Sequence, residues 1–220
     1  MDFSPNEVQR EVIELAADVL RKECDPGQDD LDPSLGYDSR AWAALAKVGL
    51  LAIALPEELG GDGLGVGEIS AVLYEIASRG ARVPALAALA LGILPITGHG
   101  TVEQQAELLP SLAAGDSLVT GAPSELGEPL TLTPRTTAVR TEHSWKLHGH
   151  KVGVPFAAQS VRVLVPANTS EGLAVFLIDP AADGVELVLT HTATGLPEYT
   201  MRLSGAVSYT HLTLPTILLV

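Results

Sequence analysis

Helical periodicity dominates the first half of the chain. Apolar residues from position 8 to position 20 recur at intervals of three and four, the spacing of one face of an amphipathic helix. This stripe consists of Val8, Val12, Leu15, Ala16, Val19 and Leu20. Ser4 is a suitable N-cap, Pro5 suits the first helical position, and Glu7 would complete a capping box with Ser4. We therefore predict a helix that begins at Pro5 and ends before Pro26-Gly27.

Four further helices are predicted before residue 118. Each has an apolar stripe or an almost wholly apolar sequence, with glycine, proline or a capping residue at its ends. They cover residues 39–48, 66–79, 84–94 and 101–112, and Asp38 or Ser39 would cap the first of them. A buried segment at 50–55 leads into a loop with five glycines at 60–67. Because glycine permits close backbone approach, we expect this loop to lie against another surface.

After about Ser117 the pattern changes to short segments of alternating or β-branched residues. Strands are predicted at residues 136–140, 145–152, 161–165, 173–178, 185–189 and 201–207. Short strands at this spacing, without helices between them, indicate an antiparallel barrel or sandwich. The predicted fold class is therefore α+β, with an all-α domain at 1–117 followed by a β-domain at 118–207.

Charge changes at the same place as the hydrophobic pattern. Residues 1–130 carry 21 acidic and 7 basic side chains, whereas residues 131–220 carry 6 of each. The net charge of −14 argues against binding of a nucleic-acid backbone, which requires a basic surface. An acidic surface of this kind serves solubility or a basic partner, and both alternatives stay open.

Targeting and redox features favour a cytoplasmic protein. Cys24 is the single cysteine, so no disulfide can form within the chain. Residues 1–4 lack the basic and apolar regions of a signal peptide, and the longest apolar stretch, at 83–96, is too short to span a bilayer. We expect no membrane association.

The last residues, 208–220, differ in character from the rest of the β-domain. They read SYTHLTLPTILLV, with no charged side chain and an apolar run without a stop signal. Such an end would be a sticky strand edge, and it resembles translated adapter or vector sequence. We predict that residues 208–220 are not native.

Few motifs in the chain carry chemistry on their own. No phosphate loop, dinucleotide fingerprint, zinc-type Cys/His cluster or hydrolase elbow is present. His148 and His150 share one face of a predicted strand, which could be half a metal site or a solvated face. Ser124 and Glu125, at the junction of the two domains, could hold a ligand or form a simple turn.

Three segments together resemble the acyl-CoA dehydrogenase family. The first is AWAALAKVGLLAIALPEELGGDGLGVG at residues 41–67, and the second is GTVEQQAELLPSLAAGD at 100–116. The third is WKLHGHK at 145–151, similar to the family's Trp-x-Leu-x-Gly-x-Lys hairpin. Their order and spacing agree with the family's helical N-terminal and middle β-domains, so the resemblance covers residues 3–207.

The resemblance implies an FAD-dependent oxidoreductase of fatty acid and lipid metabolism. Members transfer a hydride from the β-carbon of an acyl-CoA thioester to FAD while a carboxylate removes the α-proton, giving a trans-2-enoyl-CoA. Electrons then pass to an electron-transfer flavoprotein type of acceptor. Homo- or hetero-oligomers are expected for a full-length member.

Four cofactor-binding residues follow from matching the family's motifs to this chain. The Thr-Glu-Pro loop of the family falls on Ser124-Glu125-Leu126, and its Trp-Ile-Thr segment falls on Gly153-Val154-Pro155. The resemblance thus assigns Ser124, Glu125, Val154 and Pro155 to the flavin site. Pro155 has no N–H and no hydroxyl, so at least one flavin hydrogen bond of the family is lost.

The resemblance also implies a C-terminal four-helix domain that this chain lacks and that carries the catalytic glutamate in many members. No catalytic residue and no metal ligand is therefore assigned here. We expect the 220 residues to be an acyl-CoA dehydrogenase fragment that is inactive alone. The alternative is a non-catalytic partner subunit of a heteromeric acyl-CoA dehydrogenase, and a plain binding module is a third hypothesis.

Overall fold

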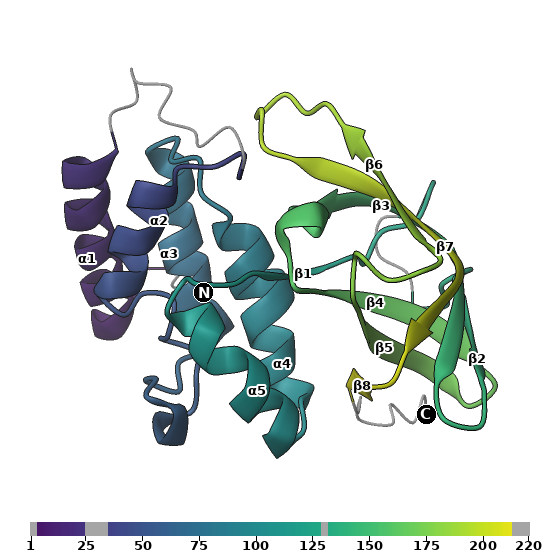
Figure 1. The fold of residues 1–220 in the computed structure, drawn as a ribbon. Helices are drawn as coiled ribbons and strands as arrows, with labels where there is room; N and C mark the ends of the chain where they lie inside the picture. The colour runs from purple at the N-terminus through teal and green to yellow at the C-terminus, as the bar shows by residue number, and fades with distance from the viewer. Residues whose placement is uncertain (1–3, 25–34, 129–131, 213–220) are drawn as a thin grey trace. The chain divides into compact units, whose positions relative to one another are not determined.

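The computed structural model describes residues 4–24, 35–128 and 132–212. Its backbone forms two compact units, one of residues 1–97 and 104–117 and the other of residues 98–103 and 118–220. The first, the helical unit, consists of helices, and the second, the β-unit, contains the sheet (Figure 1). The predicted α+β class is confirmed.

Every predicted helix is present, with shifted ends. In chain order the helices are α1 (Glu7–Glu23), α2 (Ser39–Lys47), the short 3-10 helix η1 (Glu57–Leu59), α3 (Val66–Ser78), the π-helix η2 (Leu86–Ile93), α4 (Leu94–His99) and α5 (Val102–Ala113). Their apolar faces meet in a core in which Trp42 of α2 is 2% exposed and Leu45 is fully buried. The core also contains Ala16, Leu20, Leu50, Leu55, Ile69, Val72, Leu89, Ile93 and Leu109.

The predicted cap of α1 was wrong. The helix begins at Glu7, with Asn6 rather than Ser4 as its N-cap. Asn6 Oδ1 accepts from the Gln9 amide at 2.8 Å, and Gln9 Oε1 accepts from the Asn6 amide at 3.1 Å. Asparagine caps at least as well as serine, and here a glutamine three residues later completes the box. Pro5 therefore lies before the helix.

Asn6→Ala is expected to destabilise the helical unit by about 1 kcal/mol, the usual cost of losing an N-cap side chain. Ser4→Ala should cost less, because Ser4 lies outside the capping box. Urea denaturation of W145F variants, in which Trp42 is the only tryptophan, reports on this unit. Equal effects of the two substitutions would place the cap elsewhere.

The helix predicted at 84–94 has a different geometry. Residues Leu86–Ile93 form π turns, in which the Leu94 amide donates to the Leu89 carbonyl. Pro95 has no amide proton and crowds the carbonyl four residues before it. The π-helix ends at Ile93, two residues before Pro95, and the chain then continues as α4 from Leu94 to His99. The predicted end at Leu94 was therefore wrong.

The glycine-rich loop packs against its own chain. The Gly63 amide donates to the Leu55 carbonyl, and the Leu64 amide donates to the Ile53 carbonyl, both at 2.8 Å. Residues 50–55 are the buried segment predicted just before the loop. The surface that this loop lies against is thus part of the same unit.

The β-unit contains one mostly antiparallel eight-stranded sheet. Its strands are β1 (Val119–Gly121), β2 (Thr137–Arg140), β3 (Trp145–Pro155), β4 (Arg162–Thr169), β5 (Gly172–Ile178), β6 (Val185–Thr190), β7 (Glu198–Ser208) and β8 (His211–Leu212). The order is β6-β7-β3-β2-β4-β5-β8, with β1 beside β4. The six predicted strands are confirmed. The strand β1 was missed because its three residues are all buried and show no alternation.

Parallel pairing is the exception in this sheet. The strand β1 runs parallel to β4, and Thr137 of β2 pairs in parallel with Asn168 of β4. The remaining pairs of strands are antiparallel, as predicted. A 3-10 turn, η3 (Ala157–Gln159), links β3 to β4.

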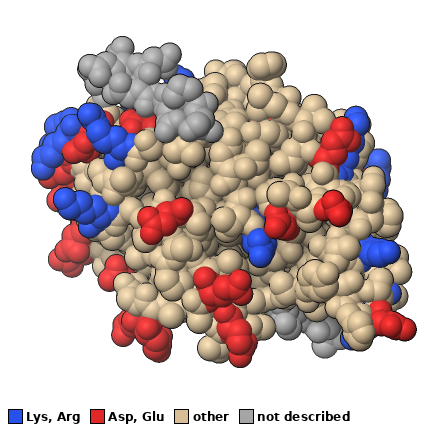
Figure 2. Space-filling model, in the orientation of Figure 1, with Lys and Arg blue, Asp and Glu red and all other residues tan. Residues whose placement is uncertain are grey.

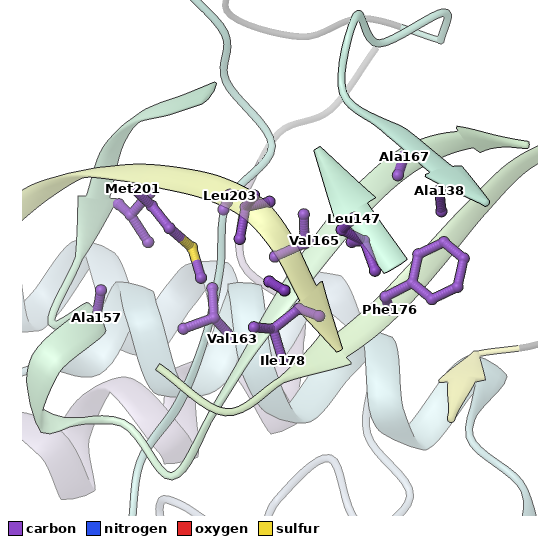
Figure 3. Close-up of a cluster of buried hydrophobic side chains, with 13 residues drawn as sticks. Ala138, Leu147, Ala157, Val163, Val165, Ala167, Phe176, Ile178, Met201 and Leu203 are labelled. Atoms are coloured by element: carbon purple, nitrogen blue, oxygen red, sulfur yellow. The ribbon is translucent and has the colours of Figure 1, made fainter. Parts of the chain in front are cut away.

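One apolar cluster fills the interior of the sheet. Side chains from β2, β3, β4, β5 and β7 converge on it (Figure 3). They include Ala138, Leu147, Val163, Val165, Phe176, Ile178, Met201 and Leu203. These five strands are consecutive in the sheet order, and β3, which leads to the site described below, contributes Leu147 and Val154 to the core.

Part of the segment predicted to be non-native is paired with the sheet. Ser208 ends β7, and Leu212 of β8 pairs with Val175 of β5. Residues 213–220 lie outside the described part of the chain. That residues 208–220 are not native stays a prediction.

The acidic side chains visible on one face of the protein do not form a single patch. On the face in Figure 2, acidic side chains are scattered rather than gathered in one patch. This arrangement favours the solubility explanation of the net charge of −14. Among the described residues, no helix combines the length and the hydropathy needed to cross a bilayer.

Candidate functional site

The four assigned site residues fall on two segments of the β-unit that the fold brings together. Ser124 and Glu125 lie in the turn after β1, whereas Val154 and Pro155 lie at the end of β3. The Val152 amide of β3 donates to the Ser124 carbonyl at 3.1 Å. The segments are therefore neighbours in space, although about 30 residues separate them in the sequence.

Glu125 directs its carboxylate into the protein. The residue is 5% exposed. Its Oε1 accepts from Lys151 Nζ at 2.8 Å, from Thr136 Oγ1 at 2.6 Å and from the Thr136 amide at 3.0 Å. Its Oε2 accepts from the Arg135 amide at 2.8 Å. The protein's own donors thus occupy the carboxylate, and any effect of Glu125 on a cofactor would pass through the turn that it holds.

Lys151 is the site residue that the sequence analysis missed. Its side chain is fully buried and forms an ion pair with Glu125. Alternation along β3 gave a usable signal, because Lys151 is in phase with Leu147, which lies in the sheet core. A lysine at an inward position requires a buried partner, since an unpaired charge there would be costly.

The close approach of Thr136 explains why the middle position of the Leu-x-Gly-x-Lys pattern is a glycine, Gly149. A Cβ placed on Gly149 would lie 2.7 Å from the Cα of Thr136. The absence of a side chain lets Thr136 approach β3 closely enough to bond the carboxylate of Glu125. The pattern therefore has three roles. Leu147 packs in the sheet core, Gly149 allows the close approach of Thr136, and Lys151 provides the cation that pairs with Glu125.

Gly149→Ala is expected to destabilise the β-unit by about 2 kcal/mol, because the added methyl overlaps the Thr136 backbone. The control is Gly98→Ala, where an added methyl meets nothing within 4 Å. Urea denaturation followed by Trp145 fluorescence in a W42F background measures both. Equal stabilities of G149A and G98A would contradict the close approach.

Opposing effects set the pKa values of the pair. Burial alone would raise the pKa of Glu125, but the hydrogen bonds from Lys151, Thr136 and the Arg135 amide outweigh it and lower this pKa to about 2. Burial lowers the pKa of Lys151, and its contact with Glu125 partly offsets that effect. The 2.8 Å separation of Lys151 Nζ and Glu125 Oε1 is that of an ion pair, a carboxylate facing an ammonium.

At the end of β3 the two assigned residues play different parts. Val154 is fully buried and belongs to the sheet core, so its side chain is a packing group. Pro155 pairs with Glu198 of β7 and offers neither an N–H nor a hydroxyl. Gly153, which precedes them, has a backbone φ of 62°, a conformation that residues other than glycine rarely adopt. A residue as large as tryptophan would be strained there.

Two buried polar atoms bear on whether a cofactor fits. Thr120 Oγ1 of β1 and Gln159 Oε1 of η3 have no hydrogen-bond partner among the described residues. Buried polar atoms are normally satisfied, by protein, water or a ligand. Both atoms are enclosed by the protein itself, so neither counts as a flavin contact; the fit rests on Ser124, whereas Pro155 removes one contact.

The structure provides little support for a metal site. His148 and His150 are exposed on β3 and face Ser204 and Arg202 of β7 in the pairing register. Within the described ranges, no group of three or more His, Cys, Asp or Glu side chains could hold a metal ion. The exposed positions favour the solvated-face interpretation of this histidine pair.

Comparison with known proteins shows which family the chain resembles. The family model "Acyl-CoA dehydrogenase, N-terminal domain" matches residues 6–116. Acyl-CoA dehydrogenase FadE28 of Mycobacterium tuberculosis is 37% identical over 205 residues, which make up 93% of this chain and 53% of that protein. The chain thus spans about half the length of the curated relatives it matches.

Two solved structures extend the similarity to the fold. The ChsE4-ChsE5 complex from Mycobacterium tuberculosis matches with a TM-score of 0.83 and 30% identity, over 97% of this chain and 59% of the other. The "Tcur3481-Tcur3483 steroid ACAD G363A variant" matches with a TM-score of 0.82 and 30% identity, over 94% and 57%. Structures with bound FADH2 or FAD share the fold at 20% and 23% identity. The chain belongs to the acyl-CoA dehydrogenase family.

Proposed function

We propose that this chain is the helical and β-domain portion of an FAD-dependent acyl-CoA dehydrogenase subunit, and that its β-unit holds part of the flavin. The observation that carries the proposal is the hydrogen bond between Val152 and Ser124, which joins the two segments assigned to the flavin site. Family membership supports the cofactor. The reaction is the α,β-dehydrogenation of an acyl-CoA thioester.

FAD, when bound, supplies a hydride acceptor for the β-carbon of the substrate. The chain's own task is to bind and orient it. Ser124 would provide a hydroxyl, and the backbone around Val154 would provide a surface backed by the sheet core. No described residue is assigned as the base that removes the α-proton.

The relatives support a substrate class and partners for this proposal. The Tcur3481-Tcur3483 steroid ACAD, whose structure is 30% identical to this chain, gives a lead to the substrate. This relationship supports a bulky, sterol-derived acyl-CoA as the first substrate class to test. An electron-transfer flavoprotein would accept the electrons, and we place the protein in the cytoplasm.

A second candidate is the partner subunit of a heteromeric acyl-CoA dehydrogenase. Pro155 favours it, because this position cannot provide the hydrogen bonds that the family's Trp-Ile-Thr segment implies. The 30% identical ChsE4-ChsE5 structure is itself a complex of two different proteins. In this case a second type of subunit would complete the flavin site.

Titration of the 220-residue chain with FAD tests the proposal. We expect weak, saturable quenching of flavin fluorescence. Ser124→Ala should weaken binding about fivefold, equivalent to one hydrogen bond of about 1 kcal/mol. Ser70→Ala in α3 is the matched control and should leave binding unchanged.

A dye-coupled assay with acyl-CoA should show little or no turnover by the 220 residues alone. Absence of any FAD binding would instead favour a binding module of another kind. Coexpression of the longer parent gene with candidate second subunits separates the two enzyme hypotheses. Flavin bound only in the presence of a second subunit would favour the heteromer.

A further inference from the structure

We propose that the buried Glu125–Lys151 ion pair is a positioning device that fixes Ser124 against the end of β3 and thereby sets the geometry of the flavin site. The inference rests on the proposed function. Neither side chain of the pair is assigned a contact with the cofactor. Both act through the turn that contains Ser124, so they are positioning residues.

The pair forms one of two adjacent links between the same segments. Glu125 bonds Lys151 through its side chain at 2.8 Å, and the neighbouring Ser124 carbonyl accepts from the neighbouring Val152 amide at 3.1 Å. Two consecutive residues of the turn are therefore tied to two consecutive residues of β3. Two adjacent links restrict both the distance and the rotation of the turn, which one link would not.

The turn itself is closed by its backbone. The Glu125 amide donates to the Glu128 carbonyl at 3.0 Å, and the Glu128 amide donates back at 2.9 Å. The carboxylate of Glu125 also receives the amides of Arg135 and Thr136. A single buried carboxylate is thus hydrogen-bonded to the residues just before β2 and to the middle of β3, and it belongs to the turn itself.

Stability alone is a weak reason to bury such a pair. Removing two charges from water is costly, and apolar residues of similar volume often replace a buried ion pair without loss of stability. An apolar pair, however, forms no directional hydrogen bonds. Here four donors converge on two oxygens, so the Glu125 carboxylate has one satisfied orientation and the backbone of Ser124 has one position.

The test compares the 220-residue chain with its E125Q/K151M variant, which removes both charges and the side-chain link to β3. We expect hydrogen exchange at the Val152 amide to accelerate at least tenfold, with exchange in β4 and β5 unchanged. The dissociation constant for FAD should rise at least tenfold, although the melting temperature stays near that of the parent. The control, E186Q/R202M, removes an exposed ion pair on β6 and β7, in which Arg202 Nη1 lies 3.4 Å from Glu186 Oε2. It should change neither the exchange rate at Val152 nor the dissociation constant for FAD.

Each result decides between the hypotheses. Unchanged exchange at Val152 would overturn the proposal, as would faster exchange with unaltered FAD affinity. If the parent chain binds no FAD but E125Q/K151M still exchanges faster at Val152, the ion pair positions Ser124 as proposed, and the proposed function is refuted instead. If E125Q/K151M does not fold, E125D is measured in the same way, because it keeps both charges and shortens the link by one methylene.

Discussion

Lys151→Met is expected to lower the free energy of unfolding of the β-unit by about 3–5 kcal/mol, the cost of leaving one buried charge without its partner. Methionine keeps much of the length and volume of lysine, so little cavity forms. The loss arises because the Glu125 carboxylate, 5% exposed, would face an apolar side chain. Urea denaturation in a W42F background measures it, since Trp145 then reports on the β-unit alone.

Two comparisons isolate the charge effect of this substitution. The double variant E125Q/K151M should recover most of the loss, because no unpaired charge remains. Arg202→Met removes the cation of an exposed pair with Glu186, and should cost less than about 1 kcal/mol. A K151M protein as stable as the parent would show that Lys151 is not buried against Glu125.

Acid should destabilise the β-unit between about pH 4.5 and pH 2. The folded pKa of Glu125 is about 2, against an ordinary value of 4.5. A lowered folded pKa means that the stabilisation is complete above 4.5 and is lost as pH falls toward 2. The shift corresponds to about 3 kcal/mol. Burial lowers the pKa of Lys151 from its ordinary value of 10.5, and the contact with Glu125 partly offsets that effect.

The measurement is the free energy of unfolding at several pH values in the W42F background. In E125Q/K151M the acid-dependent loss should be smaller by about 3 kcal/mol, because that protein lacks the buried carboxylate. Other carboxylates contribute equally to both proteins and cancel in the comparison. Parallel pH profiles of the two proteins would contradict the lowered pKa.

Local pattern was sufficient for most of the secondary structure. The stripe from Val8 to Leu20 predicted α1, although Val8 and Leu15 are exposed. Asp38, one of two candidate caps, accepts from the Ala41 amide at 2.9 Å. Where prediction failed, two local signals competed. Ser4 and Asn6 could each cap α1, and the outcome depended on Gln9, which bonds Asn6. The geometry of η2 depended on Pro95, whose effect reaches back along the helix.

The assignment of a flavin site to two segments of the β-unit stays a prediction. The family's motifs identified the segments of Ser124-Glu125 and Val154-Pro155, and the fold placed them side by side. They did not show that the Glu125 carboxylate faces inward or that Val154 belongs to the core. Both facts depend on which strands lie next to β3.

The sequence by itself determined most of the helices and strands, because these follow from periods of two and 3.6 residues. Only the tertiary structure decided the partner of Lys151, which lies 26 residues away in Glu125. Periodicity shows that a side chain is buried but not what it meets. That contact depends on the register of β2, β3 and the turn after β1, and on the close approach of Thr136 to Gly149.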